Sequence, residues 1–258
     1  MSPGTPDARP GSGPPLVILP GLGPAGSARR DAALTGDLRP FRPLARHHAL
    51  HVLHRRTGLA RGTTIAALAD DCAATLTARF AGPVDVLGVS TGGSIAQQLA
   101  VTRPRLVRRL VLLCSACRLS PHGRAVQRSF ARRLEAGDVR RAWAGAGAAL
   151  AAGRAGSRFL GALMWAVGPS TADPDPSDLI ATIEAEDAFD IEDDLARVEA
   201  RTLVVAGARD RFYSPELFRL TAARIPGARL LLHRSAGHAG VLTRERTTRE
   251  ILRFLDEP

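Results

Sequence analysis

The sequence contains no lysine and no asparagine, so all 35 basic residues are arginines, against 25 acidic residues and a formal net charge of +10. A basic excess of this size attracts polyanions such as nucleic acids. Here, however, arginine alone carries the excess, beside abundant alanine, glycine and proline. GC-rich coding produces that bias without selection for a partner, so we expect no nucleic-acid partner.

Cysteine is also scarce, because the chain has only Cys72, Cys114 and Cys117. Three cysteines cannot form the disulfide framework of a small secreted fold. Cys114 and Cys117 have CxxC spacing, but no second pair completes a zinc site. We therefore expect buried thiols, no metal ion and a reducing, cytoplasmic location.

Long apolar runs are absent, and none approaches the roughly 20 residues that a membrane-spanning helix needs. Residues 1–14 are rich in proline and glycine and lack the apolar region of a signal peptide, which favours a disordered tail. We expect no membrane span.

Charge of one sign is scarce in two long stretches. Residues 103–158 hold 13 arginines and only Glu135 and Asp138 as acids, whereas residues 173–199 hold 11 acids and only Arg197 as a base. Two interpretations stay open: the stretches neutralise each other, or the basic part from Arg118 to Arg158 attracts an anionic substrate or acyl carrier.

Short apolar runs alternate with helical patterns in the first and last parts of the chain. This alternation is typical of a parallel sheet covered by helices, and the length of 258 residues suits one such domain. Strands are predicted at 16–19, 50–54, 84–89, 110–114, 202–206 and 229–232, and helices at 64–81, 215–224 and 244–255. Residues 119–188 lack strand signals, so we expect a helical cap there, inserted into a core of residues 15–118 and 189–258.

A G-x-S-x-G pattern follows the third predicted strand, with Ser90 between Gly88 and Gly92. A serine at a sharp strand-to-helix turn needs small residues two positions before and after it, because the backbone is strained and crowded there. The turn lifts the hydroxyl to the carboxyl end of the sheet, where open α/β sheets bind ligands. Ser90 is therefore the predicted nucleophile.

A serine nucleophile needs a histidine base and a carboxylate that orients it, in the chain order Ser, Asp or Glu, His. Asp210 and His238 each follow a predicted strand and fill these roles. His233 is the competing base, although it directly adjoins a strand. His47, His48, His51 and His54 could suggest a metal cluster, but no carboxylate or cysteine accompanies them.

The reaction also needs two donors for the oxyanion. The backbone N–H of Thr91 is one candidate. The glycine turn after the first strand supplies the other, with Leu22 as the first choice and Gly23 as the second.

With these motifs in this order, the chain resembles the α/β-hydrolase superfamily along nearly its whole length. The resemblance implies a mostly parallel sheet with helices on both faces, a cap, a Ser90–Asp210–His238 triad and a mechanism without a cofactor. Two departures matter. The oxyanion turn begins Pro20–Gly21 where the family commonly has His-Gly, and too few residues precede the first strand for the usual opening hairpin, so about six strands are expected.

Together these features predict a carboxylesterase-like hydrolase that cleaves an ester, lactone or thioester of a small-molecule acyl substrate. Met164, Trp143 and Trp165 in the cap are candidates for substrate binding, though each could equally be cap core. Ser90 argues against haloalkane dehalogenase and epoxide hydrolase relatives, which use a carboxylate there. Serine-triad haloperoxidase, perhydrolase or lyase relatives and a small-molecule receptor with little turnover remain alternatives. The acyl group, the leaving group and the oligomeric state are not predicted.

Overall fold

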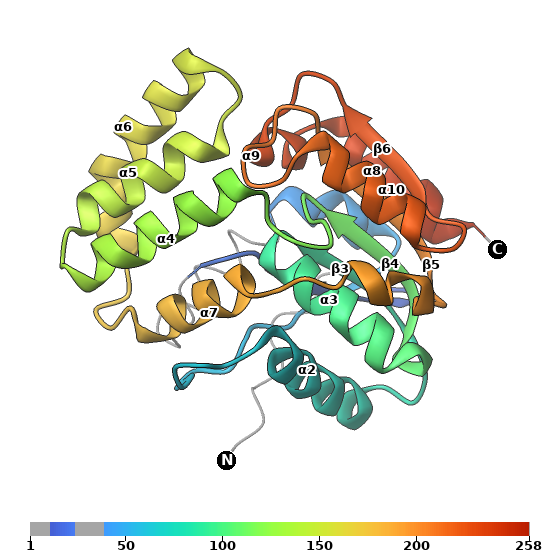
Figure 1. The fold of residues 1–258 in the computed structure, drawn as a ribbon. Coiled ribbons are helices and arrows are strands. Elements are labelled where there is room, and N and C mark those ends of the chain that lie inside the picture. Colours follow the sequence, from blue (N-terminus) through green and yellow to red (C-terminus); the bar gives the residue numbers. More distant parts are fainter. Residues whose placement is uncertain (1–10, 24–38, 258) are drawn as a thin grey trace.

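A single sheet of six strands forms the centre of the protein in the computed structural model, which describes residues 11–23 and 39–257 (Figure 1). The strand order is β2-β1-β3-β4-β5-β6, and every neighbouring pair is parallel. The strands are β1 (Pro15–Leu19), β2 (Ala49–Val52), β3 (Val84–Val89), β4 (Val107–Leu113), β5 (Arg201–Gly207) and β6 (Arg229–His233). All six lie where the apolar runs predicted them, which confirms the parallel sheet.

Helices cover both faces of this sheet, as the fold class requires. One apolar layer contains residues of α2 (Ile65–Arg79), α3 (Thr91–Thr102) and α8 (Pro215–Arg224). The opposite layer contains residues of the 3-10 helix η2 (Arg39–Arg46), α9 (His238–Leu242) and α10 (Glu245–Asp256). Two short 3-10 helices, η3 (Pro104–Leu106) and η4 (Glu192–Arg197), complete the connections. The predicted α/β fold is confirmed.

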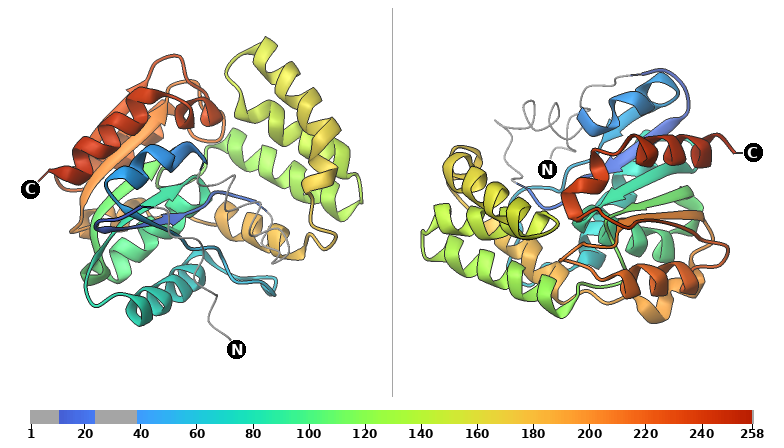
Figure 2. Two further views of the ribbon diagram at one scale, coloured as in Figure 1. Left: turned by 180° about the vertical axis from the view of Figure 1, so that it is seen from behind. Right: turned by 90° about the horizontal axis from the view of Figure 1, so that it is seen from above.

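Four helices occupy the chain between β4 and β5: α4 (Pro121–Glu135), α5 (Val139–Leu150), α6 (Arg154–Thr171) and α7 (Ser177–Asp187). The first three form a group at one side of the molecule, and α7 lies next to them (Figures 1 and 2). Buried side chains of α4, α5 and α7 make a third apolar cluster, here called the cap cluster: Phe130, Ala131, Leu134, Ala142, Leu179, Ile180 and Ile183. These helices lie where a cap was predicted, while the division of the chain into core and cap stays a prediction.

The outward face of α6 carries several exposed apolar side chains. Phe159 is 72% exposed and Trp165 is 49% exposed, and Leu163 and Val167 are also exposed. In the part of the chain that the structure describes, every helix falls short of the length and apolar character that crossing a bilayer requires.

The predicted disordered tail, residues 1–14, lies mainly outside the described residues, which start at Gly11. At the end of that segment, the Pro14 carbonyl oxygen accepts a hydrogen bond from the Ala49 N–H at 3.0 Å. This contact continues the pairing of β1 with β2 by one residue.

Candidate active site

Ser90 stands at the turn between β3 and α3 with φ 51° and ψ −121°. A positive φ is uncommon for a residue with a Cβ and stores strain, which persists only where the surroundings enforce it. The flanking glycines show that enforcement. A Cβ on Gly88 would lie 2.5 Å from the Gly93 Cα, and a Cβ on Gly92 would lie 2.1 Å from the Leu19 carbonyl oxygen. The crowding expected of the G-x-S-x-G turn is therefore present.

The structure brings Ser90, His238 and Asp210 into one hydrogen-bonded chain. The Ser90 Oγ lies 3.1 Å from the His238 Nε2, and the His238 Nδ1 lies 2.7 Å from the Asp210 Oδ2. Because an ionised carboxylate only accepts hydrogen bonds, the Nδ1 carries a proton and donates it. The Nε2 of the neutral ring is then free to accept the Ser90 hydroxyl proton, which is the arrangement that a general base needs.

Asp210 is held by its own loop. Its Oδ1 accepts hydrogen bonds from the backbone N–H groups of Phe212 at 2.8 Å and Tyr213 at 3.2 Å, and its side chain has no exposed surface. The rings of Phe212 and Tyr213 both contact the His238 imidazole, Tyr213 nearly parallel to it at 6.1 Å between centroids. The loop after β5 therefore orients both the acid and the base.

The competing base, His233, lies apart from this chain. It is the last residue of β6, and its Nε2 lies 2.9 Å from the Thr247 Oγ1. Burial, together with the nearby charges of Arg244 and Arg246, lowers the pKa of His233 below its ordinary value. The contacts of His233 indicate a structural role.

Within residues 11–23 and 39–257, one group of side chains has ligand atoms close enough to share a metal ion, namely Cys114, Asp210 and His238. The four histidines between 47 and 54 are not part of it. Burial raises the pKa of the Cys114 thiol well above its ordinary value, and the Cys114 Sγ donates a hydrogen bond to the His238 carbonyl oxygen at 3.2 Å. A protonated thiol is a poor metal ligand and a poor nucleophile. Cys72 and Cys117 are free and buried as well, which confirms the expectation of buried thiols.

The two predicted oxyanion donors approach Ser90 from different elements. Thr91 is the first residue of α3, so its N–H is one of the first-turn amides that lack an acceptor inside the helix. The glycine turn lies on the other side, because a Cβ on Gly21 would be 3.4 Å from the Ser90 Cβ. The Leu22 side chain packs against the cap cluster. The donor roles of Thr91 and Leu22 stay predictions.

Arg55 is a residue of this site that the sequence did not reveal. Its Nη1 donates to the carbonyl oxygens of Pro20 at 3.2 Å and Gly21 at 3.1 Å, and its Nη2 donates to the Gly23 carbonyl oxygen at 3.3 Å. The guanidinium therefore holds the glycine turn through three carbonyl groups. In this turn Pro20 stands at the position where the family commonly has a histidine. Because Arg55 follows β2, more than 30 residues away along the chain, no local pattern links it to the turn.

Glu186 is a second residue that the sequence did not reveal. It lies in the last turn of α7, is 1% exposed, and accepts four hydrogen bonds from side chains. Its Oε2 accepts from the Thr91 Oγ1 at 2.6 Å and from the Gln127 Nε2 at 2.8 Å, and its Oε1 accepts from the Ser94 Oγ at 3.3 Å and from the Tyr213 hydroxyl at 3.0 Å. In the sequence, Glu186 is one of 11 acids in a stretch with the pattern of a solvated face.

The cap residues proposed for substrate binding contact other cap residues. Trp143 stacks edge-on against Phe130 at 5.2 Å and packs against the cap cluster, as Leu22 does. Met164 packs on α5, where a Cβ on Gly147 would lie 2.5 Å from its Cγ. Trp165 is half exposed beneath the Arg140 guanidinium, 4.7 Å from the ring centroid. Trp143 is thus the member of the set whose cluster reaches the oxyanion turn, and the substrate role of all three stays a prediction.

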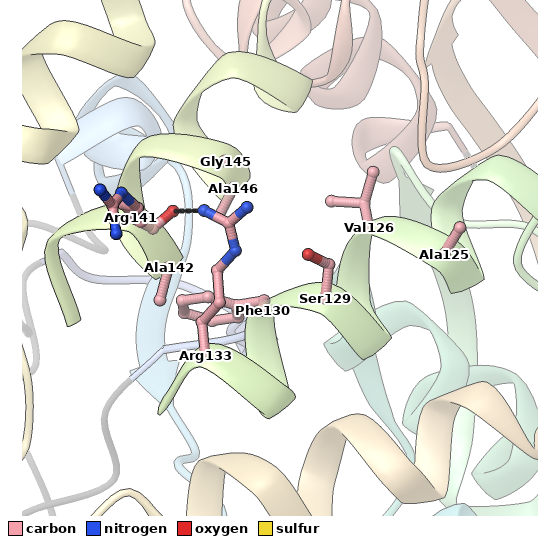
Figure 3. Close-up of a pocket in the computed structure, with 9 residues that line it drawn as sticks. All are labelled: Ala125, Val126, Ser129, Phe130, Arg133, Arg141, Ala142, Gly145 and Ala146. Carbon is pink, nitrogen blue, oxygen red and sulfur yellow. Dashed lines mark hydrogen bonds between the residues drawn. The ribbon is translucent and has the colours of Figure 1, made fainter. Parts of the chain in front are cut away.

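A cavity of about 230 Å³ lies inside the cap, between α4 and α5 (Figure 3). Arg133 and Arg141 are at one end of it, and the Arg133 Nη1 donates to the Arg141 carbonyl oxygen at 3.0 Å. The other lining residues are Ala125, Val126, Ser129, Phe130, Ala142, Gly145 and Ala146. None of these residues belongs to the Ser90 chain, but Phe130 and Ala142 are members of the cap cluster.

The two oppositely charged stretches meet at a few points. Arg118 forms ion pairs with Asp190 and Glu192, and Arg128 pairs with Asp187 at 2.7 Å. Other arginines of the basic stretch pair elsewhere, such as Arg103 with Asp70. The stretches therefore neutralise each other locally, at and just after the C-terminal end of α7, rather than along their whole length.

Comparisons with known proteins agree with the fold. A sequence model of the Alpha/beta hydrolase family matches residues 16–251. The chain is 33% identical over 265 residues to the polyketide synthase ThaQ of Burkholderia thailandensis, a match that covers 96% of this chain but spans only 12% of ThaQ. It is 28% identical to a protein of Pseudomonas syringae pv. syringae provisionally named carbamate hydrolase RutD, with 89% of this chain and 88% of that protein covered. The crystal structure of a hydrolase from Pseudomonas aeruginosa PA01 superposes with a TM-score of 0.76 and 26% identity, covering 97% of this chain and 93% of that one.

Proposed function

The chain belongs to the alpha/beta hydrolase family, and from that premise we propose that it is a serine hydrolase that cleaves an ester, lactone or thioester through an acyl-enzyme on Ser90. The observation that supports the proposal is the continuous chain from the Ser90 Oγ through the His238 ring to the Asp210 Oδ2, with separations of 3.1 and 2.7 Å. Both distances are within hydrogen-bonding reach, as a nucleophile, its base and the orienting acid require.

In the first half of the reaction, the Ser90 Oγ attacks the carbonyl carbon while the His238 Nε2 takes the hydroxyl proton. The carbonyl oxygen becomes an oxyanion facing the N–H groups of Thr91 and Leu22. When this intermediate collapses, the bond to the leaving group breaks and the leaving group receives the proton from Nε2. The product is an acyl-enzyme on Ser90.

In the second half, a water molecule attacks the acyl-enzyme and gives its proton to the same Nε2. Collapse of the second intermediate returns the proton to the Ser90 Oγ and releases a carboxylic acid. Asp210 stays ionised throughout, because its role is to hold the Nδ1 proton and stabilise the imidazolium.

The substrate class is proposed from the chemistry of the cap. The cap cluster next to the oxyanion turn is made of apolar side chains, so an apolar acyl part suits it. A panel of p-nitrophenyl esters, lactones and acyl-CoA thioesters of increasing chain length measures the preference directly. A p-nitrophenyl carbamate belongs in the panel because of the similarity to RutD.

The nucleophile is tested with a fluorophosphonate probe. We expect the probe to label Ser90 in the wild-type protein, and Ser90→Ala to lose both the label and turnover, with kcat lower by about 10⁵ to 10⁶ as for other serine nucleophiles. Intact mass and peptide mapping locate the label. Labelling that persists unchanged in Ser90→Ala contradicts the assignment, and a single burst of product at protein stoichiometry without turnover favours a receptor instead.

A further inference from the structure

Glu186 connects three parts of the molecule that meet at Ser90: the first turn of α3, the loop that carries Asp210, and the cap helices α4 and α7. We propose that Glu186 is a positioning residue, which holds the oxyanion amide of Thr91 and the His238 ring in register with Ser90. This inference rests on the proposed function, because it assigns Glu186 a role in the reaction at Ser90.

The number of donors suits a carboxylate at this position. A carboxylate offers about four acceptor sites on two oxygens, whereas a glutamine offers one carbonyl oxygen and two N–H donors. The four groups on Glu186 are three hydroxyls and one amide N–H, placed two on each oxygen. A carboxylate accepts from all four together. With a glutamine, the two groups on the nitrogen side can no longer donate to this residue, so their protons must turn to other acceptors.

The contacts with α3 bear on the oxyanion site. Thr91 follows the nucleophile directly, and its hydroxyl donates to Glu186 over 2.6 Å. Ser94, one helical turn later, donates to the other carboxylate oxygen over 3.3 Å. Two contacts one turn apart on the same helix face fix the rotation of the first turn, and therefore the direction of the Thr91 N–H.

The contact with Tyr213 bears on the histidine. The Tyr213 hydroxyl donates to Glu186 over 3.0 Å, while its ring lies parallel to the His238 imidazole within 16°. The backbone N–H of the same tyrosine donates to Asp210. One residue thus links Glu186 to both members of the proposed pair, to the base through its ring and to the acid through its backbone N–H.

The contact with Gln127 brings the cap into the same network. Gln127 lies on α4 and Glu186 on α7, so the bond of 2.8 Å between them joins two cap helices at the carboxylate that binds α3. The next residue, Asp187, behaves differently, because its carboxylate pairs with the exposed Arg128. Adjacent acids on one helix therefore offer a test residue and a matched control.

The experiment compares Glu186→Gln with Asp187→Asn, after the wild-type protein has been shown to turn over an ester and to label at Ser90. We expect Glu186→Gln to lower kcat by about 10- to 100-fold, less than the loss of a whole oxyanion donor, with KM within about threefold of wild type. Affinity for a boronic acid, which mimics the tetrahedral intermediate, should fall in parallel with kcat. Asp187→Asn should leave kcat, KM and the boronic acid affinity at wild-type values.

A second pair of variants separates positioning from folding. Thr91→Val removes the hydroxyl that binds Glu186, and Thr91→Ser retains it. We expect Thr91→Val to lower kcat and Thr91→Ser to keep it near the wild-type value. In the double variant Thr91→Val with Glu186→Gln, kcat should fall by less than the product of the two single effects, because both substitutions break the same Thr91–Glu186 hydrogen bond. If Glu186→Gln does not fold, the comparison of kcat between Thr91→Val and Thr91→Ser tests the proposal alone.

The proposal is overturned if Glu186→Gln or Thr91→Val folds and keeps kcat within about twofold of wild type, or if their effects multiply fully in the double variant. It is also overturned if the loss lies in KM alone. Absence of labelling and turnover in the wild-type protein contradicts the proposed function instead, so the two failures are distinguishable.

Discussion

Two buried carboxylates, Asp210 and Glu186, contact residues of the candidate site, and they are held in different ways. Asp210 accepts two backbone N–H groups of its own loop and one histidine nitrogen, so residues 210–213 supply most of its environment. Glu186 accepts four side chains from α3, α4 and the loop after β5. The first site is built by local chain geometry and the second by tertiary packing. The comparison teaches that the role of a buried carboxylate can be predicted from the sequence when its partners are close along the chain, and not when they are distant.

Of the two carboxylates, the local one is expected to give the larger effect. Asp210→Asn retains an oxygen for the Phe212 and Tyr213 amides but presents the His238 Nδ1 with an amide, which favours the wrong tautomer. We expect kcat to fall by up to about 10⁴ with the fold intact, as tautomer loss does in other triads. Circular dichroism and thermal unfolding check the fold, and ester turnover measures kcat.

Wild-type turnover in Asp210→Asn contradicts the role of Asp210. A fall of only about 10-fold points to a substitute carboxylate. Asp187 and Asp190 would be the candidates by sequence position, but both pair with arginines, whereas Glu186 already touches the same loop through Tyr213. A loss in the double variant Asp210→Asn with Glu186→Gln that exceeds the product of the two single effects would therefore identify Glu186 as the substitute.

An intermediate effect is expected on the other side of the oxyanion site, where the contacts are again long-range. Arg55→Met removes three hydrogen bonds to the carbonyl groups of the turn at Pro20–Gly23 while preserving much of the side-chain volume. Losing one oxyanion donor costs about 10² to 10³ in kcat, so a displaced turn should cost about 10- to 100-fold. Steady-state ester hydrolysis measures the change.

Arg56 supplies the matched control for this variant, because it pairs with Asp71 at the surface. Arg56→Met should leave kcat near the wild-type value, because Arg56 makes no hydrogen bond to the described residues of the turn and an exposed ion pair contributes little to the stability of the fold. Equal kcat in Arg55→Met and Arg56→Met would show that the guanidinium does not position the turn.

The smallest effect concerns His233, a buried ionisable group outside both carboxylate sites, and it appears in stability rather than activity. Burial lowers the pKa of His233 below the ordinary value of 6.5. As the pH falls below 6.5, the unfolded chain therefore binds a proton before the folded one does, and the free energy of unfolding decreases until the folded-state pKa is passed. Above 6.5 this contribution to the pH dependence vanishes.

His233→Gln should make this pH dependence shallower, because glutamine can still donate to the Thr247 Oγ1 but does not titrate. Urea unfolding between pH 7 and pH 5 measures the slope. A residual slope is expected from His48, whose pKa burial also lowers. A slope identical to that of the wild type would show that His233 is not a source of acid sensitivity.

Much of the fold could be predicted because its signals are local. Each strand is a short apolar run, and its position is set by the need to bury both faces in a parallel sheet. The strand ends were off by up to three residues, as at β4, which begins at Val107 rather than Leu110. The 3-10 helix η2 was not predicted, and it contains Pro43, which cannot donate the hydrogen bond that an α-helix needs there.

The sequence by itself determined the nucleophile turn, because the G-x-S-x-G pattern marks it within five residues. The contacts that require Gly88 are also local, whereas Gly92 is required by its approach to Leu19 of β1. It also determined the candidates Asp210 and His238, since each follows a strand and the ends of parallel strands meet at one edge of a sheet. Only the tertiary structure decided the roles of Arg55 and Glu186. Their partners are 34 and 95 residues away, as for Gly21 and Thr91, and one acid among 11 has no local feature that marks it as buried. Burial and long-range hydrogen bonding are properties of the packed chain, so no spacing in the sequence carries them.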